Sequence, residues 1–245
     1  MLSSQSASLQ EAIILNLTMP KPLVIIILGP PGSGKGTQAK LLVKKFKLEC
    51  FGSGDALRQR QKTGDFTAKK LIKVMGRGEL VPSFIISKFW IDGLEKFKQK
   101  AKFNGLVFDG SPRKMLEAKL FDEALNWYGW QEKAKVIFIN ISRKESFNRL
   151  TKRRQCKKCG RLIPWLGEFK KLKKCDKCGG ELINRADDKL EAIKKRLEEF
   201  KKEVIPVIKY YKEQDRLIEI NGEQSIENVF EEILSKLRWK TKKLK

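Results

Sequence analysis

A glycine-rich stretch with a single lysine, GPPGSGKGT at residues 29–37, is the first feature that could carry chemistry. Glycines let the backbone curl so that successive N–H groups point toward phosphate oxygens, and a following helix adds positive potential at its N-terminus. Lys35 adds a point charge suited to the β- and γ-phosphates of a nucleotide. The strict pattern has Ser or Thr directly after the lysine, whereas here Gly36 intervenes and Thr37 follows. The stretch therefore predicts a loop that binds a nucleoside triphosphate.

Four of the five cysteines form two pairs, Cys156-x2-Cys159 and Cys175-x2-Cys178. Each pair is followed directly by glycine, which is typical of two knuckles that make one tetrahedral four-thiolate zinc site. Four protein ligands leave no open position, so the predicted role of Zn²⁺ is structural. Nothing in the sequence indicates secretion, which makes a disulfide framework the weaker alternative. We expect the remaining Cys50 to be a buried apolar residue beside a short strand.

Hydrophobic patterning indicates the elements that position these groups. The apolar, β-branched run at residues 23–28 ends at a glycine and favours a strand buried on both faces. Strands alternate with helices along the chain, which predicts an α/β fold with a parallel sheet covered on both sides. The other predicted strands are 105–109, 135–141 and 216–220, and the predicted helices are 56–75, 83–100, 114–127, 143–153, 188–212 and 225–238. Residues 155–184 interrupt the alternation and are predicted to form a small inserted module.

Composition excludes several function classes. The chain of 245 residues has no histidine, which rules out histidine general bases, catalytic triads and histidine metal ligands. Its 53 basic and 29 acidic residues give a net charge of +24, which favours anionic partners: nucleotides, nucleic acid or acidic membrane surfaces. No apolar run approaches the roughly 18 residues of a membrane span.

The two ends of the chain differ from the rest. Residues 1–18 contain no lysine or arginine, so they fit neither a secretory signal nor a mitochondrial transit peptide. We expect residues 1–22 to be a mobile tail, with Met19 as an alternative start, and 239–245 to be a basic C-terminal tail.

Five further segments carry a family resemblance when taken with the loop. They are GSGDALR (52–58), GELVP (78–82), DGSPR (109–113), RLTKRR (149–154) and RADDKLEAIKKR (185–196). Their order and spacing resemble the adenylate kinase family of nucleoside monophosphate kinases over about residues 20–238. The resemblance implies a three-layer P-loop kinase fold, a parallel five-stranded sheet flanked by helices, within a core at 23–238. It also implies two insertions: an NMP-binding helical segment at 52–81, and a lid at 149–186 that binds zinc through four cysteines.

The activity implied by the resemblance is reversible, Mg²⁺-dependent phosphoryl transfer from ATP to AMP, giving two ADP. The expected setting is a cytoplasmic monomer that binds these nucleotides and neither a membrane nor a specific nucleic acid. The implied catalytic residues are Lys35, Asp109, Arg113, Arg153, Arg185 and Arg196. Such transfer needs two anions held in line and positive charge that converges on the moving group, so the missing histidine costs nothing.

The resemblance divides the binding residues between two nucleotides. For ATP it implies Gly32, Ser33, Gly34, Lys35, Gly36, Thr37, Arg149, Arg153, Leu162, Ile163 and Gln224, with Thr37 and, through water, Asp109 supporting Mg²⁺. For AMP it implies Ser53, Arg58, Glu79, Leu80, Val81, Gly110, Ser111, Pro112, Arg113, Glu117, Arg185 and Arg196. Arg185 and Arg196 are eleven residues apart, so we expect one helix face to present both. Asp187 and Asp188 either cap that helix or accept lid arginines, and we prefer the second role.

One position departs from the family's pattern. Glu117 stands where the family has a glutamine that reads the adenine of AMP. An ionised carboxylate only accepts hydrogen bonds, so it suits the two adjacent donors of guanine better than adenine. Ser111 also replaces the usual phenylalanine. Three hypotheses follow: an adenylate kinase, a related kinase for GMP or, less favoured, CMP or UMP, and a zinc-ribbon nucleic-acid-binding protein with a degenerate loop.

Overall fold

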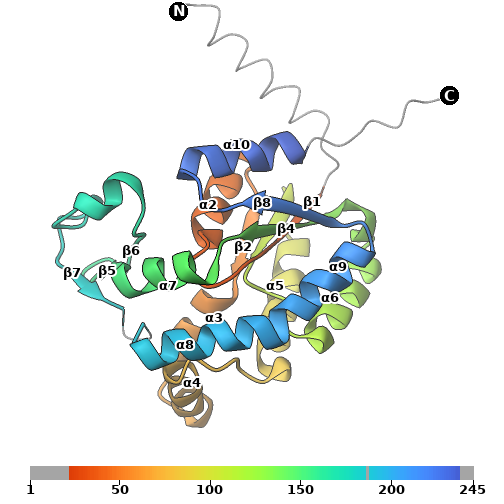
Figure 1. Ribbon diagram of the computed structural model, residues 1–245. Coiled ribbons are helices and arrows are strands. Elements are labelled where there is room, and N and C mark those ends of the chain that lie inside the picture. Colours follow the sequence, from red (N-terminus) through yellow and green to blue (C-terminus); the bar gives the residue numbers. More distant parts are fainter. Residues whose placement is uncertain (1–21, 186–187, 238–245) are drawn as a thin grey trace, which may run out of the picture.

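The computed structural model describes residues 22–185 and 188–237. Its centre is a sheet of five parallel strands in the order β2-β3-β1-β4-β8 (Figure 1). The four predicted strands are present within one residue of their expected bounds, and β2 is the fifth strand that the resemblance implied. The strands are β1 (Leu23–Leu28), β2 (Glu49–Gly52), β3 (Gly105–Asp109), β4 (Ala134–Asn140) and β8 (Leu217–Asn221).

The central strand β1 is buried on both faces, as its sequence predicts. All six side chains are at most 2% exposed. Alternate residues enter two separate hydrophobic clusters, with Val24, Ile26 and Leu28 in one cluster and Leu23, Ile25 and Ile27 in the other. Because successive side chains of a strand point to opposite faces, these clusters are the cores of the two layers.

Helices cover both faces of the sheet, which gives the three-layer α/β fold that the sequence predicts. One face carries α2 (Lys35–Phe46) and α10 (Ile226–Lys236), and the other carries α5 (Ser83–Lys98), α6 (Met115–Trp127) and α9 (Ile205–Glu213) (Figure 1). Two further helices, α7 (Arg143–Lys152) and α8 (Leu190–Glu199), pack together through Leu150, Ile193 and Leu197. In the described part of the chain, no helix is both long enough and apolar enough to cross a bilayer.

Two predicted helices are interrupted. Residues 56–75 form part of α3 (Ser53–Gln61) and α4 (Phe66–Gly76) because Gly64 turns the chain with φ 74° and the Asp65 carboxylate accepts a hydrogen bond from Ala68 N–H. The predicted helix 188–212 contains a π-helical turn, η3 (Phe200–Val204), between α8 and α9. Pro206 explains this wider turn, because its ring leaves one backbone carbonyl of the preceding turn without an N–H partner.

The inserted module forms a sheet of its own. Strands β5 (Arg154–Cys156), β6 (Leu162–Ile163) and β7 (Leu182–Asn184) are antiparallel in the order β6-β5-β7, and the 3₁₀ turn η2 (Gly167–Lys171) follows β6. The module lies beyond the end of α7, away from the central sheet, at the left of Figure 1. A second 3₁₀ turn, η1 (Gln131–Lys133), precedes β4. Apart from Pro22, the predicted tails lie outside the described residues, as does Asp187.

Candidate active site

A cleft of about 340 Å³ opens at the carboxyl ends of the parallel strands, where open α/β sheets bind ligands. The loop after β1, the start of α3, the segment before α5, the end of β3 and the inserted module all contribute to its walls. It gathers all but two of the residues predicted to bind nucleotides or to catalyse the transfer: Gly32, Ser33, Gly34, Lys35, Gly36, Thr37, Ser53, Arg58, Glu79, Leu80, Val81, Asp109, Gly110, Ser111, Arg113, Glu117, Arg149, Arg153, Leu162, Arg185, Arg196 and Gln224. Ile163 and Pro112 are buried beside it and do not line it.

The phosphate-type loop has the expected form between β1 and α2. Gly32 and Gly34 adopt φ values of 83° and 95°, which only glycine takes up readily. The Lys35 ammonium folds back and donates to the carbonyls of Gly29 and Pro30, both at 2.8 Å. Burial, aided by neighbouring guanidinium groups, lowers the pKa of Lys35 to about 7, although Asp109 opposes the shift. The loop therefore presents a desolvated cation that an anion would stabilise.

Arg113 is fixed on the other side of the cleft by the loop after β3. Its Nε donates to the Gly110 carbonyl at 2.6 Å, and its Nη2 donates to Ser53 Oγ at 3.2 Å. The Ser53 hydroxyl donates in turn to the Gly110 carbonyl at 2.8 Å, which ties α3 to the sheet. Burial lowers the pKa of Arg113, since the group is removed from water beside other cations. Arg58, at the end of the same wall, pairs with Asp55.

Asp109 ends β3 beside the loop. A Cβ added to Gly36 would lie 3.0 Å from its Oδ2, so the carboxylate reaches the first turn of α2, where Thr37 also lines the cleft. Burial raises the pKa of Asp109, and the charge of Lys35 opposes that rise. A hydroxyl and a carboxylate are hard oxygen donors of the kind that Mg²⁺ selects, so this pair fits a nucleotide-bound Mg²⁺.

Glu117, which stands where the family has a glutamine, lies at the start of α6 with 2% of its surface exposed. Its Oε2 accepts a hydrogen bond from Arg113 N–H at 2.7 Å, and its Oε1 accepts one from the Ser83 hydroxyl at 3.3 Å. Burial raises its pKa, and both hydrogen bonds oppose that rise. The pKa of Glu79 shifts in the opposite direction to that of Glu117. Its carboxylate accepts two hydrogen bonds from the Arg77 guanidinium, at 2.8 and 2.9 Å, and these lower its pKa.

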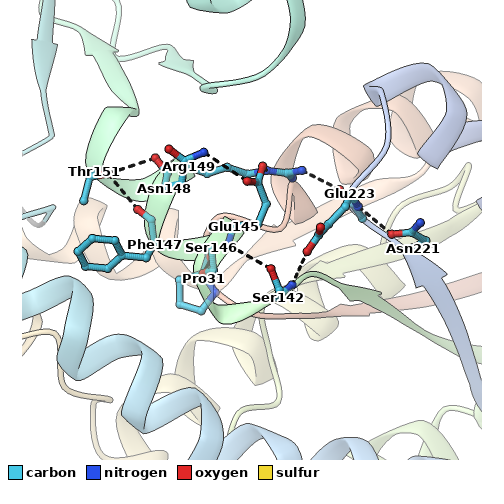
Figure 2. Close-up of polar contacts among 11 residues, drawn as sticks. Pro31, Ser142, Glu145, Ser146, Phe147, Asn148, Arg149, Thr151, Asn221 and Glu223 are labelled. Atoms are coloured by element: carbon cyan, nitrogen blue, oxygen red, sulfur yellow. Dashed lines mark hydrogen bonds and ion pairs between the residues drawn. The ribbon is translucent and has the colours of Figure 1, made fainter.

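Arg149 is buried where α7 meets the loop after β8 (Figure 2). Its Nε donates to Glu145 at 2.7 Å, and its Nη2 donates to the Gly222 carbonyl at 2.9 Å. The start of α7 is held from both sides, since Ser146 donates to the Pro31 carbonyl and Glu223 accepts from Ser142 N–H at 2.6 Å (Figure 2). Arg149 is thereby connected to the phosphate-type loop through one helix turn.

Asp188 joins two of the predicted arginines. Its carboxylate accepts Arg153 Nε and Nη2 at 2.8 and 2.7 Å, and Arg196 Nη1 at 2.7 Å. Of the two roles considered for Asp188, the structure supports the acceptor of arginines, because Lys189 is the N-cap of α8 and no side chain caps it. The expectation of one helix face for Arg185 and Arg196 is wrong, since Arg185 precedes α8 by several residues. Both still reach the cleft.

The four paired cysteines converge in the inserted module. Their Sγ atoms all lie within 4.8 Å of one another, with Cys156 to Cys178 at 3.5 Å and Cys159 to Cys175 at 3.7 Å. Zn–S bonds of about 2.3 Å give a tetrahedral edge of about 3.8 Å, so the cluster is compatible with Zn²⁺. The expectation that Cys50 is buried is wrong: it lies exposed on the edge strand β2, where it faces the cleft.

One cleft wall was missed by the sequence analysis. Pro164, Trp165 and Leu166 of the inserted module line the cleft, as do Ile226 and Val229 of α10. The available signal was Trp165, an aromatic residue two positions after Ile163 of the predicted pair.

Comparison with known proteins agrees with this geometry. The profile of the family described as "Adenylate kinase" matches residues 27–216. The chain is similar to the adenylate kinase of Caldanaerobacter subterraneus subsp. tengcongensis, with 40% identity over 85% of this chain and 93% of the relative. It is 39% identical to the adenylate kinase of Methanothrix thermoacetophila, over 85% and 95%, and 34% identical to that of Thermosipho africanus, over 87% and 99%. On this evidence the chain belongs to the adenylate kinase family of nucleoside monophosphate kinases.

Proposed function

We propose that the cleft binds ATP and AMP together and transfers the terminal phosphoryl group between them, giving two ADP. The observation that carries the proposal is the convergence of cations in one cavity. Arg113, Arg153 and Arg196 line the cleft together with the buried Lys35 ammonium, and their charges add to burial in lowering the pKa of Lys35, while Asp109 opposes the shift. Such a cluster is costly in an empty site and becomes favourable when polyphosphate enters.

Each wall of the cleft has its own part in this reaction. The loop amides, Lys35 and Arg149 would bind the donor triphosphate, while Arg113 and Arg58 would hold the acceptor monophosphate with their planar forks. Arg153, Arg185 and Arg196 would surround the phosphoryl group in flight and neutralise its charge. Thr37 and Asp109 would hold Mg²⁺, which supplies further neutralisation of the phosphate oxygens when bound.

The inserted module is the proposed lid over the donor, and the helical segment 52–81 the proposed cover over the acceptor. The module has only three short strands, so its fold depends on a Zn²⁺ ion in the cysteine cluster. We further propose a cytoplasmic monomer, and sedimentation analysis tests the oligomeric state.

A second acceptor, GMP, is favoured by one observation. The buried Glu117 carboxylate replaces the amide that would both accept from the adenine amino group and donate to the ring nitrogen N1. Guanine offers two adjacent donors to the same carboxylate. AMP remains the main proposal because the relatives that cover most of the chain are adenylate kinases.

A coupled assay of ATP with AMP, GMP, CMP and UMP in turn tests the proposal. We expect the highest kcat/KM with AMP, and a loss of at least about a hundredfold for Lys35→Met or Arg113→Ala. Lys88→Met is the matched control, because the Lys88 side chain is 72% exposed on α5 and does not line the cleft. Activity with none of the four monophosphates, or full activity in Lys35→Met, would contradict the proposal.

A further inference from the structure

The inserted module carries more positive charge than its size accounts for. Residues 154–184 contain nine basic and three acidic residues, so about an eighth of the chain holds +6 of the net charge of +24. All three acids are already paired with basic residues of the module, in the ion pairs Glu168–Lys171, Asp176–Arg161 and Glu181–Lys157. Five exposed lysines of the module have no ion pair with any residue that the structure describes: Lys158, Lys170, Lys173, Lys174 and Lys177.

The turn that carries part of this lysine-rich surface is held against the module's sheet. The Arg154 guanidinium of β5 donates to the Leu172 carbonyl at 2.7 Å and to the Phe169 carbonyl at 3.2 Å. Lys170 and Lys173 lie on either side of Leu172 in the same segment. The backbone that presents them is therefore fixed before any ligand binds, which lowers the entropic cost of binding.

The two cysteine knuckles bring the other lysines together. Lys174 pairs with Glu181 in an antiparallel bridge, and a Cβ added to the neighbouring Gly180 would lie 2.9 Å from Lys158 Cβ. Lys158 belongs to the first knuckle and Lys177 to the second, so the segment 180–181 joins lysines that are far apart in the sequence. Cations gathered on so small a module repel one another unless an anion binds them.

This surface is separate from the cleft. Leu162, Pro164, Trp165 and Leu166 are the module's contribution to the cleft lining among the described residues, and none of the five lysines belongs to it. Transfer between ATP and AMP therefore leaves these charges unused. We propose that the lysine-rich surface of the module binds the phosphate backbone of nucleic acid without reading its sequence. RNA and DNA share this chemistry, and binding releases the counterions condensed on either polymer.

The apolar residues of the module favour nucleic acid over a membrane. A peripheral surface that binds anionic lipid usually adds large apolar side chains that enter the bilayer. Among the described residues of the module, Ile183 is the one large hydrophobic side chain that is exposed, at 37%. Charge without an apolar partner face suits a soluble polyanion.

The salt dependence of binding to the full, zinc-loaded chain tests the inference. The probes are fluorescent 20-nucleotide strands of U and of dT, which separate RNA from DNA as the source of the phosphates. In a variant that combines Lys158→Ala, Lys173→Ala and Lys174→Ala, the slope of log affinity against log salt should become shallower by about 2, since each contact on a single strand contributes about 0.7. Arginine at the same three positions keeps the charge and should keep the slope.

A matched triple variant elsewhere separates this surface from the charge of the whole protein. Lys201, Lys209 and Lys212 are exposed in η3 and α9, outside the module, and their replacement by alanine removes the same charge. This control should change the slope by less than about 0.5. Transfer from ATP to AMP and zinc content should stay unchanged in both alanine variants, so a failure of the inference leaves the proposed function standing.

Three results would overturn the inference. The first is an equal change of slope in the two alanine variants. The second is displacement of the strands by saturating ATP, which would place them in the cleft. The third is tighter binding to phosphatidylserine vesicles than to either strand at the same salt concentration, which would make a lipid surface the partner.

Discussion

Arg153 at the end of α7 and Asp188 before α8 form a two-pronged ion pair, with both N–O distances below 3 Å. Arg196 donates to the same carboxylate, and the Asp188 side chain is only 2% exposed. One buried anion thus holds two guanidinium groups from different helices at the cleft. A phosphate that binds these arginines meets them already positioned, which lowers the entropic cost of binding.

Asp188→Asn should destabilise the protein by about 3 kcal/mol, because it removes the charge of a buried carboxylate that accepts hydrogen bonds from the partly buried guanidinium groups of Arg153 and Arg196. Denaturant unfolding measures this loss. Asp92→Asn is the control, since Asp92 is 51% exposed and its pair with Lys88 is long at 3.6 Å, so its cost should be below about 0.5 kcal/mol. A loss at Asp188 no larger than at Asp92 would mean that the carboxylate does not hold the arginines.

ATP binding should take up a proton at Lys35 above pH 7. In the free protein the Lys35 pKa is about 7, so the ammonium loses its proton as the pH rises through that value. Bound phosphate favours the charged form and restores the proton, so ATP affinity should fall by up to about tenfold per pH unit above 7. Calorimetry in two buffers of different ionisation enthalpy measures the uptake. Lys35→Met removes only this site, and equal uptake by both proteins would contradict the assignment.

Glu117→Gln should move acceptor preference toward AMP. The amide oxygen can still accept from Arg113 N–H, and the amide nitrogen can donate to Ser83 Oγ, so the local fold is kept. We expect the ratio of kcat/KM for AMP over GMP to rise by roughly 5- to 150-fold, which corresponds to removing a polar mismatch of about 1–3 kcal/mol. Steady-state assays with both acceptors measure the ratio. An unchanged ratio would show that Glu117 does not read the base.

Metal removal should unfold the inserted module before the core. Cys156 and Cys175 are at most 4% exposed and provide the module's interior, so removing Zn²⁺ removes the bonds that would hold the two cysteine pairs together. Hydrogen exchange after chelation, or in Cys175→Ser, should show lost protection at residues 154–184 and retained protection in β1. Cys50→Ser is the matched control, because Cys50 lies outside the cluster. Uniform protection after complete zinc removal would exclude a metal-dependent module.

Local patterns were sufficient to predict four of the five strands of the central sheet and the glycine-rich loop. The run Leu23–Leu28 is apolar at every position, as expected for a short strand that is buried on both faces. The glycines after it allow the positive φ angles that the loop adopts at Gly32 and Gly34. The spacing of the four paired cysteines likewise predicted their cluster, since each C-x2-C pair is short enough to form locally.

Features that depend on tertiary contacts were missed. The prediction of one helix over 56–75 passed over the polar residues 58–65, where the turn at Gly64 separates α3 from α4. Arg185 was assigned to a helix from residue spacing, but the chain enters α8 only at Leu190. Cys50 is exposed because β2 is an edge strand beside the cleft, and strand order is absent from local sequence. Trp165 joins the site only through the fold of the inserted module.

Titration with a bisubstrate compound, two adenosines joined by five phosphates, tests the central claim most directly. If one cleft holds donor and acceptor together, the compound should bind once per chain and compete with both ATP and AMP. Lys35→Met and Arg113→Ala should each weaken it, since they act on opposite ends. Competition with only one of the two nucleotides, or binding unchanged in both variants, would contradict a shared cleft.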